Sequence, residues 1–227
     1  MDVATPAALR ERHRMQRQYQ SQALAVRLHR AISWLQRAET DGDDDTRFIH
    51  LWIAFNAAYA GEFDFEQSER ATVAGFLARI TAADADGRLH ALLFKQFSGP
   101  IRLLIDNRYV FAPFWRALRE HDASESWKKL FEANRKAALD ALLGHRTAEL
   151  LALVLDRLYV LRNQLVHGGA TWNSAVNRGQ LRDGCALLGS LVPTFVAIMM
   201  ASSAFEDDPV AYPVVPDRPA SARDARE

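Results

Sequence analysis

The spacing of apolar side chains constrains the fold of this chain more than any other feature. Along most of the 227 residues, apolar side chains recur every three or four positions, and no alternating apolar and polar pattern lasts long enough to indicate a strand. Short turn signals such as "DGDDD", "DADG" and "GGATWNS" separate the periodic segments, which is typical of a helical bundle. The sequence therefore predicts an all-α fold, with helices over residues 15–38, 46–60, 69–82, 88–97, 124–143, 146–166 and 178–203.

The helical periodicity stops near both ends of the chain. Residues 1–15 carry arginines without an apolar run behind them, so they do not resemble a secretory signal, and we expect them to be flexible. Half of the prolines fall in the closing segment "EDDPVAYPVVPDRPASARDARE", where no helical stripe survives. We expect a helical domain over residues 16–204 and a flexible, proline-rich tail over residues 205–227.

One uncharged segment, residues 185–205, is long enough to span a bilayer. It also contains glycine, serine and threonine residues and Pro193, and the rest of the chain has an amphipathic, globular pattern. Proline deletes a backbone donor, and protein packing must compensate for that loss. We therefore favour a buried bundle helix, bent or broken near Pro193, over a membrane span.

Charge and cysteine content restrict the classes of function. The chain carries 28 basic and 28 acidic side chains, so a nucleic-acid contact must come from a local basic patch and not from a global field. Cys185 is the only cysteine, which excludes an internal disulfide, indicates a buried apolar thiol and favours a reducing cytoplasm. The histidines lack zinc-ligand spacing, and Trp52 stands where a calcium loop starting at Asp41 would need glutamate. Neither a metal nor a cofactor is expected.

Two predicted helices carry polar side chains in informative places. In "TRFIHLWIAFNAAYAG", the aromatic side chains of Phe48, Trp52, Phe55 and Tyr59 share one helix face, and Asn56 lies at the margin of that face. A buried amide needs hydrogen-bond partners. Asn56 either bonds a neighbouring helix or orients a catalytic group.

The second such helix is "RTAELLALVLDRLYVLRNQLVHGG". Arg162 lies about 40° from Leu158 on the helical wheel, at the edge of the apolar stripe, whereas His167 lies about 140° from Arg162. The two side chains can meet only if the helix ends at His167, which Gly168 and Gly169 permit. The alternative is structural: a partnered arginine and a histidine at the negative end of a helix dipole.

These segments resemble a known superfamily. "RNQLVH", from Arg162 to His167, resembles the signature of HEPN domains: an arginine, a polar residue, three further residues and a histidine at the end of a long helix. "WIAFNAAY", from Trp52 to Tyr59, resembles the aromatic helix of Apea-like bacterial HEPN proteins. The two segments occur in the same order on a helical chain and frame a HEPN-like domain over residues 16–204.

The resemblance implies an up-and-down helical bundle with extra helices and a metal-independent endoribonuclease activity. Arg162 and His167 correspond to the catalytic pair, Asn163 to the supporting polar residue, and Asn56 is a further supporting candidate. The resemblance also implies a homodimer in which two motifs face one cleft, with RNA as the substrate. The aromatic-rich segment "YVFAPFW" is consistent with such a contact, although a core position or base stacking is an alternative.

The setting implied by the resemblance is a toxin–antitoxin or antiviral-defence system in the cytoplasm, with an antitoxin or another defence protein as a possible partner. Toxins of this superfamily that a nucleotidyltransferase antitoxin controls carry a tyrosine two positions after the histidine, where this chain has Gly169. That mode of regulation is therefore not expected. Other members of the superfamily are noncatalytic nucleotide-binding or protein-interaction modules, so both classes of function stay open.

Overall fold

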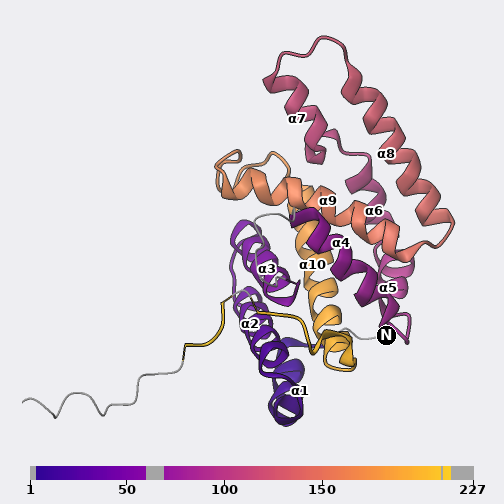
Figure 1. The fold of residues 1–227 in the computed structure, drawn as a ribbon. Coiled ribbons are helices and arrows are strands. Elements are labelled where there is room, and N and C mark those ends of the chain that lie inside the picture. The colour runs from indigo at the N-terminus through magenta and orange to yellow at the C-terminus, as the bar shows by residue number, and fades with distance from the viewer. Residues whose placement is uncertain (1–3, 60–68, 211, 216–227) are drawn as a thin grey trace, which may run out of the picture.

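The computed structural model describes residues 4–59, 69–210 and 212–215 (Figure 1). In these ranges the chain forms ten α-helices and no strand, so the predicted all-α fold class is confirmed. The helices are α1 (Pro6–Gln16), α2 (Gln22–Glu39), α3 (Asp44–Tyr59), α4 (Glu69–Ala82), α5 (Arg88–Ala91), α6 (Ser98–Ile105), α7 (Ala112–Arg119), α8 (Ser126–Leu143), α9 (Thr147–Val166) and α10 (Arg178–Met199). A π-helical turn, Leu92–Gln96, follows α5.

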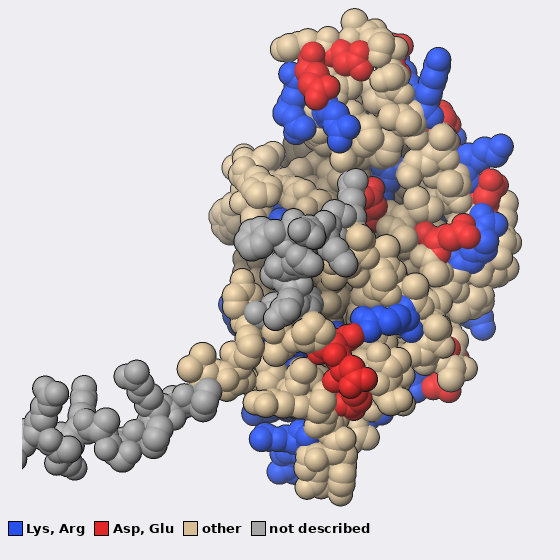
Figure 2. Space-filling model, in the orientation of Figure 1, with Lys and Arg blue, Asp and Glu red and all other residues tan. Residues whose placement is uncertain are grey.

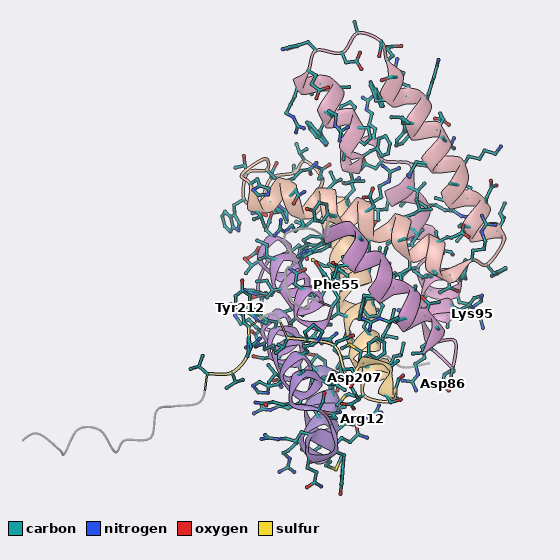
Figure 3. The ribbon with its side chains drawn as sticks, in the orientation of Figure 1. Arg12, Phe55, Asp86, Lys95, Asp207 and Tyr212 are labelled. Carbon is teal, nitrogen blue, oxygen red and sulfur yellow. The ribbon has the colours of Figure 1, made fainter. Side chains whose placement is uncertain are left out.

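The core lies where α3 packs between α2 and α10, with α4 and α9 covering the same interior. Its centre is aromatic: the ring of Phe55 lies 6.3 Å from Phe76 of α4 and 5.9 Å from Phe195 of α10 (Figure 3). All three rings are at most 1% exposed. Burial of such large apolar side chains supplies the main driving force for assembling the bundle.

Local side-chain contacts fix where the central helices begin. The hydroxyl of Ser21 accepts a hydrogen bond from the Leu24 amide, which caps α2. Asp43 accepts from the Thr46 amide at 2.9 Å, and Asp44 and Asp45 occupy the first turn of α3. The acidic run "DGDDD" therefore complements the positive end of α3, as its position before an apolar helix indicates.

The long apolar helix α10 runs without interruption through Pro193, so of the two expected alternatives, a bend or a break, the break does not occur. By length and composition α10 could cross a membrane, but 72% of its most apolar window is buried inside the protein. Cys185 on this helix is 2% exposed, as predicted for an apolar thiol, and burial raises its pKa to about 12. That thiol is protonated at neutral pH and is not an activated nucleophile.

Two helices that the sequence did not predict, α6 and α7, connect the core to α8. Figure 1 shows α7 and α8 as a hairpin that stands away from α1, α2 and α3. The hairpin rests on α9, which contacts both α8 and the turn before α7. Phe111, in that turn, is 5% exposed and belongs to the aromatic segment whose packing the sequence left open.

The two ends of the domain extend further than the sequence predicted. Residues 4–15 were expected to be flexible, but Thr5 caps α1, and Leu9 of α1 is 1% exposed. The carboxyl-terminal tail was expected to be flexible from residue 205, but Phe205 is fully buried, and Asp208 binds Arg27 and Arg79. Figure 3 shows this segment passing Asp207 and reaching Tyr212, whose carbonyl accepts a hydrogen bond from Arg30 of α2. In the described residues, each end therefore packs a large apolar side chain against the bundle, Leu9 at one end and Phe205 at the other. The expected division into a domain and two flexible ends stays a prediction.

Candidate functional site

The candidate site lies at the carboxyl end of α9. The helix ends at Val166, His167 is its capping residue, and Gly168 adopts a left-handed conformation with φ +71°. The Ala170 amide then donates to the Gln164 carbonyl at 3.0 Å, which turns the chain back over the last helical turn. The helix ends where the two glycines predicted, and this ending leaves the His167 side chain exposed.

An open groove of about 480 Å³ separates this end of α9 from α7. One wall comes from α9 and the loop after it, and includes Tyr159, Asn163, Gln164 and His167. The other wall comes from α7 and includes Trp115, Arg116 and Arg119. Of the sequence-predicted site residues, the structure thus brings Asn163 and His167 into one groove.

Arg162 does not line this groove. Its side chain is half-buried, and its Nη1 donates a hydrogen bond to Oδ1 of Asn163 at 3.0 Å. Because Asn163 itself lines the groove, it connects Arg162 to the face that carries His167. Within one chain, Arg162 therefore does not join His167 in the lining of this groove, although both stand at the end of α9.

Asn56 lies elsewhere. It is in α3, outside the groove lining, and its buried Oδ1 accepts no hydrogen bond from the described residues. The structure therefore supports neither a bond from this oxygen to a neighbouring helix nor a direct role in the groove.

A shared acceptor holds the two walls of the groove together. The carbonyl of Tyr109 accepts hydrogen bonds from Nε1 of Trp115 and Nε2 of Gln164, both at 2.7 Å. The Gln164 side chain also accepts from Nδ2 of Asn177 at 3.2 Å. These bonds connect α7, α9 and the loop before α10, which suits a preformed binding surface.

The two arginines of the α7 wall were not predicted as site residues. Arg116 and Arg119 are exposed, and neither side chain makes an ion pair or a hydrogen bond within the described ranges. They stand three residues apart on one helix face, in the segment "APFWRALR". That spacing was readable in the sequence, but no helix was predicted over this segment, so the two positions were not recognised as neighbours.

Figure 2 shows basic and acidic side chains in small mixed groups over the face in view, without a large field of one sign, as expected for a chain with no net charge. Among the described residues, no group of three or more histidine, cysteine or acidic side chains could hold a metal ion. The positive charge available to a ligand is therefore local and comes from Arg116 and Arg119.

The chain matches no family model, no curated protein and no solved structure. The groove and the motif at its edge are accordingly the observations that bear on function.

Proposed function

We propose that this protein is a metal-independent endoribonuclease of the HEPN type. The observation that carries the proposal is the groove in which His167 and Asn163 of the motif face two arginines that have no partner among the described residues. Phosphodiester cleavage needs a proton-transfer group and a cation near the phosphate, and this groove offers both. The helical bundle that presents them is, in this proposal, a HEPN bundle with extra helices.

The chemistry follows from the residue types. Imidazole is a common general acid and base, so the His167 side chain can take the proton of a ribose 2′-hydroxyl or supply a proton to the leaving 5′-oxygen. The 2′-oxygen attacks the adjacent phosphorus, and the bond from phosphorus to the 5′-oxygen breaks. The products are a 2′,3′-cyclic phosphate and a 5′-hydroxyl, and a nearby guanidinium stabilises the charge that develops on the phosphate.

We also propose that the active form is a homodimer. Arg162 lies outside the groove of its own chain, so a composite site needs a second copy placed against the end of α9. Leu118 of α7 and Leu130 of α8 are 58% and 54% exposed and would gain cover in such an assembly. The proposed setting is cytoplasmic toxin–antitoxin or antiviral defence, with an antitoxin or defence protein as partner.

The second candidate is a noncatalytic HEPN-like module that binds a nucleotide or a protein. The engagement of Arg162 by Asn163 favours it, because this arginine is then a structural residue at the end of α9. In both candidates a ligand binds in the groove. Only in the first is a phosphodiester bond of that ligand broken.

Incubation of the pure protein with defined RNAs in chelator tests the proposal. We expect fragments that end in 2′,3′-cyclic phosphate and begin with 5′-hydroxyl, and light scattering at micromolar concentration should give twice the chain mass. Intact RNA under all conditions would contradict the nuclease, and a monomer that cleaves RNA would contradict the composite site.

A further inference from the structure

We propose that Arg116 and Arg119 of α7 hold the phosphates of an RNA strand that lies in the groove between α7 and the end of α9. This inference rests on the proposed function for the identity of the occupant. It assigns phosphate binding to a helix outside the recognised motif and leaves proton transfer to His167.

The pair has no acidic partner that would occupy its guanidinium groups. Some exposed arginines, such as Arg14 and Arg146, form ion pairs with neighbouring glutamates, whereas others, such as Arg10 and Arg17, have no acidic partner in the described part of the chain but lie outside the groove. Arg116 and Arg119 have none among the described residues, and like charges three residues apart weaken a helix slightly. Both cations lie in the last turn of α7, where the negative end of the helix dipole stabilises positive charge. This effect does not explain why both side chains line the groove.

The pair also lies opposite the predicted catalytic residues. Arg116 and Arg119 line the same groove as Asn163 and His167, from the opposite wall. Arginine presents a planar set of donors that matches a phosphate, so a strand held by α7 would pass the His167 imidazole. Arg162, which Asn163 engages outside the groove, is not placed to make that contact in the same chain.

Aromatic side chains complete the lining of the groove. Trp115 and Tyr159 also line the groove, and the Trp115 ring is fixed by its hydrogen bond to the Tyr109 carbonyl. An indole held in a basic groove is a platform on which an unpaired base can stack. The groove volume of about 480 Å³ suits a nucleotide unit of a single strand. Arginines beside a fixed aromatic ring favour a nucleic-acid strand over an acidic protein segment, which offers charge without bases.

The test is a binding measurement that does not depend on cleavage. His167→Ala protein is titrated into a labelled, unstructured RNA of twelve nucleotides, and fluorescence anisotropy is followed at several salt concentrations. The variant Arg116→Gln/Arg119→Gln is compared with Arg10→Gln/Arg17→Gln, which removes two exposed arginines on and just after α1. Figure 1 places α1 at the opposite end of the molecule from α7, so both variants lose the same charge in different places.

We expect the α7 double variant to bind RNA at least tenfold more weakly than the α1 double variant. The slope of log affinity against log salt should fall by about 1.4 in the α7 variant, since each phosphate contact on a single strand contributes about 0.7. Arg116→Lys/Arg119→Lys should retain most of that slope, and melting curves should be the same for all variants. A purely structural role for the pair would change melting and leave the salt slope intact.

The outcomes separate this inference from the proposed function. If the α7 and α1 variants bind equally, the phosphate site is wrong, whether or not the wild type cleaves RNA. If binding depends on Arg116 and Arg119 but the wild type cleaves nothing, the phosphate site stands and the nuclease proposal fails. If the protein does not bind RNA, or binds poly-glutamate as tightly as RNA, the groove is not an RNA-binding site.

Discussion

Single residues in this protein decide how the α7–α8 hairpin is held against the core. Arg157 of α9 is 1% exposed and is enclosed by the rings of Phe111 and Phe131, 4.5 and 5.3 Å from its guanidinium carbon. Its Nη2 donates to Asn134 at 2.8 Å, whereas its buried Nη1 has no hydrogen-bond partner. Burial lowers the pKa of Arg157 to about 10, so keeping this charge in the interior costs about 3 kcal/mol at neutral pH.

This cost predicts opposite results for two substitutions at the same residue. Arg157→Met keeps the apolar length of the side chain and removes the charge, so we expect unchanged or higher stability. Arg157→Ala leaves a cavity between Phe111 and Phe131 and should cost about 2 to 4 kcal/mol. Urea unfolding measures both, and a methionine variant as unstable as the alanine variant would show that the cation–ring contacts outweigh the burial cost.

At the level of single residues, part of the site could be predicted from the sequence. The apolar stripe and the two glycines predicted that α9 ends beside His167, and the structure confirms that ending. The engagement of Arg162 by Asn163 was not predicted, because a helical wheel gives the direction of a side chain and not its hydrogen-bond partner.

At the scale of elements, the long helices with a clear apolar stripe and the segment of α5 with its π-helical turn were predicted, whereas α1, α6 and α7 were not. The predictions for α4, α8, α9 and α10 were close to the observed bounds. Both α6 and α7 are eight residues long and carry a proline in the first turn, so neither shows the long periodic stripe on which the helix predictions depend. The α7 wall of the groove was therefore not predicted.

Two glycines of α10 give a prediction about how closely the core helices approach. A Cβ added at Gly184 would lie 2.8 Å from Cε2 of Phe48 and 3.2 Å from Cδ2 of Leu158, whereas at Gly189 the nearest atom would be 3.7 Å away. Gly184→Ala should therefore cost about 1 to 3 kcal/mol through overpacking, and Gly189→Ala should gain about 0.5 to 1 kcal/mol from helix propensity. Thermal melts of the two variants check this contrast, and equal shifts would mean that Phe48 moves aside freely.

At the scale of the whole molecule, contacts between distant parts of the chain close the bundle. Asp208, beyond α10, binds Arg27 of α2 and Arg79 of α4, and the backbone and carboxylate of Glu206 bind Ser21. Partners more than a hundred residues apart leave no periodic signal in a sequence. The anchoring of residues 206–208, called the strap below, therefore could not be predicted from composition. The sequence predicted a flexible, proline-rich tail from residue 205, whereas in the structure Glu206 and Asp208 bind side chains of the bundle.

The strap predicts an effect of Asp208→Asn on stability. Burial alone raises the pKa of Asp208, but the hydrogen bonds from Arg79 and the charge of Arg27 lower it overall below its ordinary value. Asp208 therefore stabilises the fold above the ordinary carboxyl pKa, and this contribution is lost as pH falls through the lowered pKa. At neutral pH, Asp208→Asn should cost about 2 to 3 kcal/mol, since Asp208 is 19% exposed and its partner Arg27 is 1% exposed.

Asp207→Asn is the matched control for this substitution. Asp207 is exposed and makes no ion pair with a described residue, so its loss should change stability by less than about 0.5 kcal/mol. The difference between the two variants should shrink when unfolding is measured in acid. A constant difference from neutral pH to strong acid would contradict the ion-pair account of the strap.

The central claim is that the groove at the end of α9 cleaves RNA, and the most direct test is cleavage by three proteins in chelator. Wild type, His167→Ala and Arg162→Ala are compared on one defined RNA, with thermal melts and light scattering on the same samples. Loss of a proton-transfer group or a phosphate-stabilising cation should lower the cleavage rate by at least ~100-fold in each variant. The free energy of unfolding of His167→Ala should lie within about 1 kcal/mol of the wild-type value, because His167 is an exposed capping residue. Normal cleavage by His167→Ala would contradict the assignment of the catalytic residue, and a wild type that cleaves nothing while Arg162→Ala loses the dimer would make the motif structural.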